Sequence, residues 1–178
     1  HQDHLQPSEV KQYAQAHNLP VLQPVKMKDP DFLAELESYH ADLQVVVAFR
    51  MLPEVVWSMP RFGTFNVHAA LLPQYRGAAP INWAVINGET ETGVTTFFLD
   101  KDIDTGRIIL SKTFAIPDDA NVEYVYDGLM ALGADAAVET VDAMLQGNGE
   151  VPSMDQAPLA EGTELKPAPK IFKETCQI

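Results

Sequence analysis

Two amphipathic helices are predicted by the spacing of apolar positions near the start of the chain. Between Ser8 and Asn18 these positions recur at i, i+3, i+4 and i+7, the period of one helix face, and Ser8 can cap the helix. A second helix is expected to begin at Pro30, because Asp29 can cap it and proline suits a first turn. Its apolar stripe consists of Phe32, Leu33 and Leu36.

The middle of the chain alternates short apolar runs with helical segments. The run from Leu43 to Phe49 is β-branched and nearly all apolar, which is typical of a parallel strand buried on both faces. A short helical turn is expected at Pro53, a strand at 65–69, and a helix from Pro80 to about Asn87.

The second half predicts a hairpin and one long helix. Residues 94–99 and 108–116 have the character of strands, and the loop between them contains turn residues. Residues 120–145 predict a long amphipathic helix, and the proline-rich remainder from Val151 predicts an extended linker. The expected inner side of the long helix carries Val122, Tyr126, Leu129, Gly133, Ala136, Thr140 and Met144. Strands alternating with helices predict an α/β fold with a mostly parallel sheet flanked by helices.

Composition narrows the possible partners and the compartment. The 178 residues suffice for one domain with its own core, but a formal net charge of −13 disfavours nucleic-acid binding by these residues alone. Cys176 is the only cysteine, which suits a reducing compartment such as the cytoplasm. No apolar run approaches the ~20 residues that cross a membrane, so no membrane partner is expected.

Three residues form the strongest candidate for chemistry. Asn66 and His68 stand two positions apart on a predicted strand, so both side chains project from the same face. Asp104 lies in the loop between the two later strands. An amide N–H can stabilise an oxyanion, an imidazole can shuttle protons near neutral pH, and a carboxylate can orient the imidazole and accept protons.

Each of these residues also has a purely structural interpretation. Asn66 can form a turn, His68 can be a hydrogen-bonded histidine at a strand end, and Asp104 can be a turn residue before Thr105-Gly106. A zinc site is not expected, because no second His or Cys with ligand spacing lies near the motif. No Ser or Cys stands beside His68, which agrees with chemistry that needs no covalent nucleophile.

Several motifs in a fixed order resemble the folate-dependent formyltransferases. Residues 66–81 read NVHAALLPQYRGAAPI, residues 88–96 read GETETGVTT, and Asp104-Thr105-Gly106 follows. The resemblance extends from about Pro7 to the end and is strongest to the branch that acts on methionyl initiator tRNA. It implies a Rossmann-like α/β fold, 10-formyltetrahydrofolate as co-substrate, and no metal.

The resemblance also implies roles for individual residues. Asn66, His68 and Asp104 match the catalytic residues, and Arg76 with Gly77 is expected to bind substrate, although Arg76 can equally be a surface ion-pair partner. The expected folate-binding residues are Phe49, Arg50, Met51, Leu52, Leu71, Leu72, Pro73 and Asp100. Leu71, Leu72 and Pro73 can instead serve core packing and a turn. Many members have Tyr-Gly at the Phe49-Arg50 position and Ser at the Ala70 position.

The family pattern gives an expected domain organisation. Residues 1–150 would form the catalytic domain without its first strand–helix unit, and residues 151–178 a linker toward an absent C-terminal β-barrel domain. Methionyl initiator tRNA would then bind mainly through that absent domain, and the protein would act as a monomer. The alternatives are a sugar-nucleotide N-formyltransferase, a formyltetrahydrofolate hydrolase or a folate-binding module without turnover.

Overall fold

The computed structural model describes residues 7–48, 51–156 and 163–172, and the chain divides into two compact units, His1–Tyr39 and His40–Ile178. The first unit contains helices α1 (Glu9–Ala16) and α2 (Pro30–Ser38). Both predicted caps are confirmed: Ser8 Oγ accepts from the Lys11 amide at 3.2 Å, and Asp29 Oδ1 accepts from the Asp31 amide at 2.9 Å. The apolar stripe expected on α1 is not buried within the described residues.

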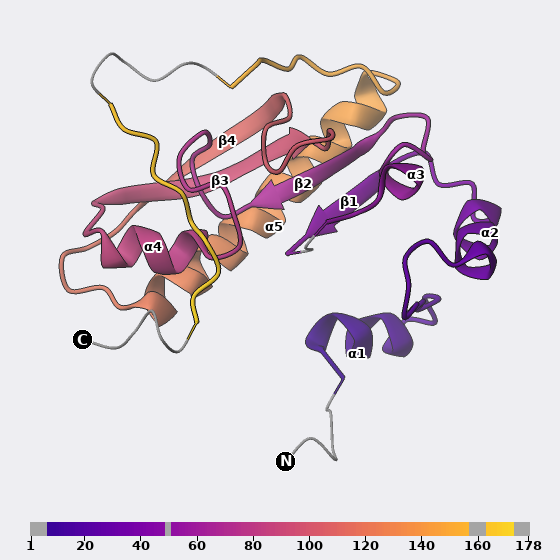
Figure 1. Cartoon of the computed structure of the whole chain (residues 1–178), viewed down its shortest axis with the longest axis horizontal. Helices are drawn as coiled ribbons and strands as arrows, with labels where there is room; N and C mark the ends of the chain where they lie inside the picture. Colours follow the sequence, from indigo (N-terminus) through magenta and orange to yellow (C-terminus); the bar gives the residue numbers. More distant parts are fainter. Residues whose placement is uncertain (1–6, 49–50, 157–162, 173–178) are drawn as a thin grey trace. The chain divides into compact units, whose positions relative to one another are not determined.

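The second unit is built on a four-stranded sheet in the order β1-β2-β3-β4 (Figure 1). The strands are β1 (Gln44–Val47), β2 (Thr64–His68), β3 (Glu91–Phe98) and β4 (Ile108–Ala115). β1 and β2 pair in parallel as predicted, and β3 and β4 form the expected antiparallel hairpin. β2 and β3 are also antiparallel, so the sheet is mixed, with its parallel pair at the start.

The prediction of a strand buried on both faces is wrong for β1. Val45 and Val47 are 43% and 58% exposed, whereas the alternate residues Gln44 and Val46 are half-buried. Successive side chains of a strand point to opposite faces, and the described residues cover only one of these faces at β1. A run of valines by itself does not reveal whether one or both faces of a strand are covered.

Three helices accompany the sheet: α3 (Glu54–Trp57), α4 (Pro80–Ile86) and the long α5 (Val122–Gln146). α5 lies across one face of the sheet (Figure 1), where Thr140 Oγ1 is 2.9 Å from Thr96 Oγ1 of β3. The inner side of α5 differs from the prediction at its first turns, because Val122 and Tyr126 are exposed while Val125 is fully buried. The confirmed inner residues are Leu129, Ala136, Thr140 and Met144.

The described parts of the tail, residues 151–156 and 163–172, are extended, as expected, and they hydrogen-bond to the rest of their unit. Met154 forms an isolated antiparallel bridge with Ile108, and Ala168 forms a parallel bridge with Gly77. Ala168 is completely buried within the core cluster. The stretch around Ala168 runs beside α4 as the yellow segment of Figure 1.

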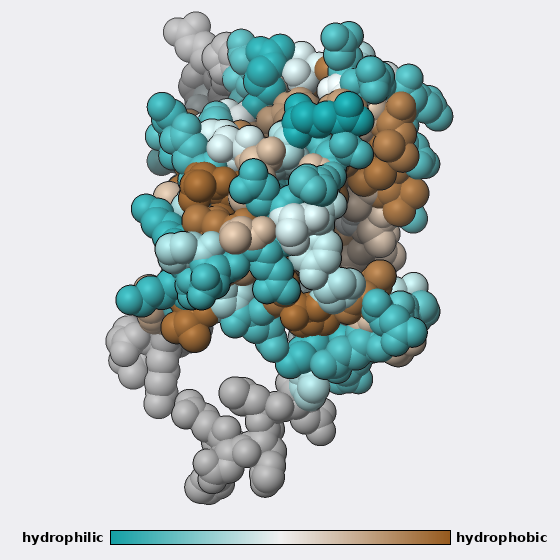
Figure 2. All heavy atoms as spheres, turned by 90° about the vertical axis from the view of Figure 1, so that its right-hand side faces the viewer, coloured by the Kyte–Doolittle hydropathy of each residue, from teal (hydrophilic) through white to brown (hydrophobic). Residues whose placement is uncertain are grey.

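The surface mixes apolar and hydrophilic side chains, as the brown and teal spheres on the face in Figure 2 show. Among the described helices, none combines the length and the hydrophobicity that a membrane span requires.

Candidate active site

β2 brings the first two candidate residues to one face of the sheet. Asn66 pairs with Phe97 and His68 with Thr95 across the β2–β3 ladder. The predicted shared face is therefore confirmed, because the intervening Val67 packs toward Gly133 of α5 on the other side. The His68 ring meets the Phe97 ring edge-on at 6.3 Å, and His68 is only 7% exposed.

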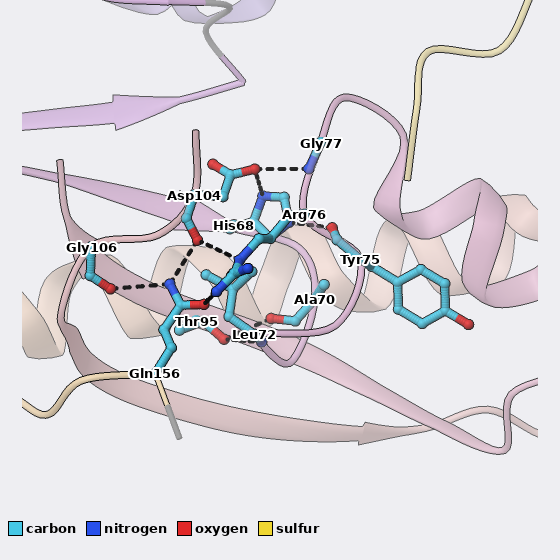
Figure 3. Close-up of polar contacts among 10 residues, drawn as sticks. All are labelled: His68, Ala70, Leu72, Tyr75, Arg76, Gly77, Thr95, Asp104, Gly106 and Gln156. Carbon is cyan, nitrogen blue, oxygen red and sulfur yellow. Dashed lines mark hydrogen bonds and ion pairs between the residues drawn. The ribbon is translucent and has the colours of Figure 1, made fainter. Parts of the chain in front are cut away.

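A buried threonine fixes the turn that follows β2. Thr95 Oγ1 donates to the Ala70 carbonyl at 2.6 Å and accepts from the Leu72 amide at 3.2 Å. Ala70 is fully buried, so this turn belongs to the core rather than to a mobile loop. The Thr95 side chain thereby sets the path of the chain from His68 toward Tyr75 (Figure 3).

The two ring nitrogens of His68 have different partners. Nε2 lies 2.8 Å from the Tyr75 carbonyl, which can only accept, so Nε2 carries a hydrogen. Nδ1 lies 3.9 Å from Asp104 Oδ2, which is ion-pair range but longer than a hydrogen bond. In the neutral ring, Nδ1 is therefore the nitrogen that can accept a proton, and it faces the carboxylate (Figure 3).

Asp104 is held by its backbone as well as by its side chain. The carboxylate accepts from the Gly77 amide at 2.8 Å, and only 9% of the residue is exposed. Its φ of 57° lies in the left-handed region, which is uncommon for residues other than glycine. The loop therefore presents the carboxylate in one particular orientation toward His68.

Arg76 and Gln156 both hydrogen-bond to the backbone of Asp104 (Figure 3). Arg76 Nε donates to the Asp104 carbonyl at 3.2 Å, and its Nη2 donates to Gln156 Oε1 at 2.7 Å. Gln156 Nε2 in turn donates to the Asp104 carbonyl at 2.6 Å. The Arg76 guanidinium thus donates to two uncharged oxygens, the Asp104 carbonyl and Gln156 Oε1. Among the described residues it takes part in no salt bridge.

A cavity of about 350 Å³ adjoins these residues, and both Asn66 and Asp104 line it. Its other walls come from β1, the residues before α3, α3 itself and the loop after β3. Most of these lining residues are apolar, and the charged ones are Glu54, Asp100, Lys101 and Asp102. Asn66 Oδ1 is buried without a hydrogen-bond partner among the described residues. A buried amide oxygen without a partner is costly unless a ligand or water satisfies it, so this atom makes the cavity a candidate binding site.

The expected folate-binding residues divide into three groups. Met51, Leu52 and Asp100 line the cavity. Leu71, Leu72 and Pro73 do not line it; Leu72 is buried, and Leu71 packs where a side chain on Gly93 would stand. Phe49 and Arg50 lie outside the described residues.

A second polar cluster, formed by Tyr75, Glu89 and Lys166, attaches the tail to the rest of its unit. Glu89 Oε1 accepts from the Tyr75 hydroxyl at 2.7 Å and from Lys166 Nζ at 2.6 Å. The hydrogen bond from Lys166 lowers the pKa of Glu89, and the same bond raises the pKa of Lys166. Burial, followed by the hydrogen bond to Glu89, raises the pKa of the Tyr75 hydroxyl.

Sequence reasoning missed three contributors to the site: the Tyr75 carbonyl, the Gly77 amide as a partner of Asp104, and Gln156. Two of these are backbone groups, which no residue pattern identifies. Gln156 stands in a segment without periodicity, 52 positions from Asp104, so nothing in the sequence links the two. Among the described residues, no group of three His, Cys, Asp or Glu side chains could hold a metal ion.

Comparison with known proteins identifies the family. The formyl transferase family matches residues 1–141. This chain belongs to that family. The chain is 63% identical over 174 residues to a methionyl-tRNA formyltransferase of Bacteroides fragilis, covering 98% of this chain and 53% of the relative. It is 53% identical over 171 residues to one of Flavobacterium johnsoniae, covering 96% of this chain and 53% of the relative.

Solved structures share the fold. A phosphoribosylglycinamide formyltransferase from Bacillus halodurans aligns with a TM-score of 0.72 at 22% identity, over 80% of this chain and 78% of that chain. HypX from Aquifex aeolicus, crystallised with tetrahydrofolic acid, aligns with a TM-score of 0.67 at 23% identity, over 84% of this chain and 25% of that chain. These matches support the Rossmann-like α/β fold. The chain spans about half the length of the curated relatives it matches.

Proposed function

We propose that the protein containing this chain transfers a formyl group from 10-formyltetrahydrofolate to the amino group of methionyl initiator tRNA. The observation that carries the proposal is the cluster of Asn66, His68 and Asp104 beside a cavity, in a chain 63% identical to a relative named methionyl-tRNA formyltransferase. We also propose that the protein acts in the cytoplasm as a monomer.

The cavity suits a flat, partly apolar ring with polar edges. The side chains of Met51, Leu52 and Trp57 provide apolar walls, while Asp100 and Asn66 provide polar groups. The unpaired Asn66 Oδ1 is the feature that fits a ligand best, because an N–H donor on the ring system of a bound folate can supply the missing partner. When bound, 10-formyltetrahydrofolate supplies the formyl group.

Asn66 is assigned to charge stabilisation. As the acceptor amine adds to the formyl carbon, negative charge develops on the formyl oxygen. The carboxamide N–H of Asn66 can donate to that oxygen, and it does so without titrating. The rigid position of Asn66 in β2 keeps this donor preorganised.

His68 and Asp104 are assigned to proton transfer. The attacking amine must lose a proton, and the departing nitrogen must gain one. Because His68 Nε2 is bound to the Tyr75 carbonyl, Nδ1 is the nitrogen that takes and returns protons. The Asp104 carboxylate, 3.9 Å away, stabilises the imidazolium and can accept the proton of the amine.

The acidity of the chain bears on how tRNA binds. A formal net charge of −13 repels phosphates, so we propose that most of the tRNA affinity comes from the part of the protein outside this chain. These 178 residues alone, if they fold, are expected to bind tRNA weakly. Tight binding by them with a steep salt dependence would contradict this assignment.

The proposal is tested by formyl transfer with the full-length protein. The acceptors are methionyl initiator tRNA and a UDP-amino-sugar, and the variants are Asp104→Asn and Asp118→Asn, the latter an exposed aspartate outside the site. We expect formylated methionyl-tRNA at the full rate from the wild type and from Asp118→Asn, and at a rate about 10²–10⁴-fold lower from Asp104→Asn. Transfer to the sugar alone would identify an amino sugar, and not methionyl-tRNA, as the acceptor. Release of formate without transfer would indicate a hydrolase.

A further inference from the structure

The side chain of Gln156 ties together the two loops that hold the candidate site (Figure 3). Its Nε2 donates to the Asp104 carbonyl at 2.6 Å and to the Gly106 carbonyl at 3.0 Å. Its Oε1 accepts from Arg76 Nε at 3.2 Å and from Arg76 Nη2 at 2.7 Å. Both hydrogens of the amide and its oxygen are therefore engaged with residues of the site.

The Asp104 backbone needs such support. Its left-handed conformation, with φ at 57°, is unfavourable for an L-residue and persists only where surrounding contacts offset the strain. The carbonyl that Gln156 binds belongs to Asp104 itself. The hydrogen bond therefore orients the peptide group next to the Cα that carries the carboxylate. That carboxylate must stay on the Gly77 amide at 2.8 Å and in reach of His68.

We propose that Gln156 is a positioning residue for Asp104, an inference that rests on the proposed function of the site. It acts through the aspartate rather than on a substrate: it fixes the Asp104–Gly106 loop and orients Arg76 against the same carbonyl. The segment after α5 is thereby part of the active-site architecture and not only a connection.

The tail does not need Gln156 for its attachment at this point. Arg107 holds the preceding residues, with Nη1 on Asp155 Oδ1 at 2.6 Å and Nη2 on the Ser153 carbonyl at 2.7 Å. Met154 adds two backbone hydrogen bonds to Ile108, at 2.8 and 2.9 Å. A loss caused specifically by changing Gln156 can therefore be separated from a loss caused by loosening the tail.

The variant that tests the proposal is Gln156→Glu in the full-length protein. It keeps the shape and the acceptor for Arg76 but removes the donor to the Asp104 and Gly106 carbonyls. The matched control is Asp155→Asn, which weakens the neighbouring tail anchor and touches no residue of the site; its side chain is 86% exposed. We expect kcat of Gln156→Glu to fall by about 10- to 100-fold, with KM for both substrates little changed, since small misplacements cost up to about 10²-fold. Asp155→Asn should retain wild-type kinetics.

A double-mutant cycle separates positioning from a general structural role. If Gln156 acts through Asp104, the Gln156→Glu change has no further effect in the Asp104→Asn background. If Gln156→Glu does not fold, Gln156→Ala takes its place in the cycle.

Hydrogen exchange of the free protein gives a readout without activity. We expect faster exchange in the peptide 99–107 of Gln156→Glu, and wild-type exchange there in Asp155→Asn. A wild type that formylates methionyl-tRNA, combined with a Gln156→Glu variant of unchanged kcat and exchange, would overturn this inference and leave the proposed function intact. A wild type that formylates neither acceptor would instead overturn the function, and the exchange result would then decide the role of Gln156 in holding the loop.

Discussion

At the residue scale, the site depends on groups that are buried and individually constrained. His68 has one nitrogen committed to a carbonyl, and Asp104 is fixed by the Gly77 amide. Asn66 is the exception, because its side-chain oxygen has no partner among the described residues. A polar group left without a partner reduces stability, so Asn66 is the residue whose presence fold stability explains least.

Replacing Asn66 by alanine should therefore separate activity from stability. We expect Asn66→Ala to lower kcat for formyl transfer by about 10²–10³, the usual effect of removing an oxyanion donor. The thermal midpoint should stay the same or rise, because a buried unsatisfied oxygen is removed. Asn82→Ala, an exposed asparagine of α4, is the control in both the kinetic assay and the calorimetric scan. A large drop in thermal midpoint with unchanged kcat would assign Asn66 a structural role.

Gly77 should not tolerate a side chain. Its φ is +128°, and an added Cβ would lie 2.5 Å from the Ala168 carbonyl oxygen, so the tail or the loop would have to move. We expect Gly77→Ala to lower the free energy of unfolding by about 1–3 kcal/mol, and to reduce kcat because its amide binds Asp104.

The matched control for this change is Gly88→Ala. Gly88 also has a positive φ, +66°, but an added Cβ there would meet nothing within 4 Å. Gly88→Ala should lower the free energy of unfolding only by the cost of its backbone strain, and it should keep wild-type kcat. Chemical denaturation measures the first quantity and initial rates measure the second. Equal losses at both positions would mean that the approach of Ala168 does not matter.

At the element scale, α5 packs on the sheet through small residues at selected positions. Gly128 faces the Phe114 ring of β4 so closely that an added Cβ would overlap it. An added Cβ on Gly133 would lie at an ordinary 3.5 Å from Val67 Cγ1. Two glycines of one helix therefore have different surroundings, and the sequence pattern alone does not distinguish them.

Alanine at these two positions should change stability in opposite directions. We expect Gly128→Ala to destabilise by about 1–3 kcal/mol through overpacking. Gly133→Ala should stabilise by up to about 1 kcal/mol, because alanine favours the helix and the space suffices. Urea denaturation of both variants in the full-length protein measures the difference. A stabilising Gly128→Ala would show that the Phe114 ring turns aside at little cost.

At the scale of the whole molecule, the main structural feature is the return of the tail onto the domain. Lys166 reaches Glu89, the Tyr75 amide donates to the Lys166 carbonyl at 2.7 Å, and Trp83 Nε1 donates to the Pro169 carbonyl at 2.8 Å. These contacts join residues 77 to 91 positions apart. The Tyr75 carbonyl that holds His68 thus belongs to a residue whose amide is held by the tail.

The ionic part of this attachment should respond to pH. The pKa of Glu89 is lowered from 4.5, so its contribution is present above that value and is lost as the pH falls through the lowered pKa. The pKa of Lys166 is raised from 10.5, so its contribution is present below that value and is lost as the pH rises through the raised pKa. We therefore expect the tail to be held most firmly between these limits.

Fluorescence of Trp83, in a Trp57→Phe background, reports on the tail directly because Trp83 donates to Pro169. We expect an emission change as the pH falls below 4.5, and the Glu89→Gln variant should lack this acid step. An identical acid step in the variant would assign the change to another group.

The sequence by itself determined the elements and the candidate chemistry. Helix caps, the strand that carries Asn66 and His68, the hairpin and the long helix all follow from local periodicity and from residues a few positions apart. Only the tertiary structure decided that Val45 and Val47 are exposed, because burial depends on which elements pack against a strand. It also decided that Gln156 meets Asp104, since this contact joins distant segments through a backbone carbonyl. Every residue has a backbone carbonyl, so a contact of this kind leaves no signature in the sequence.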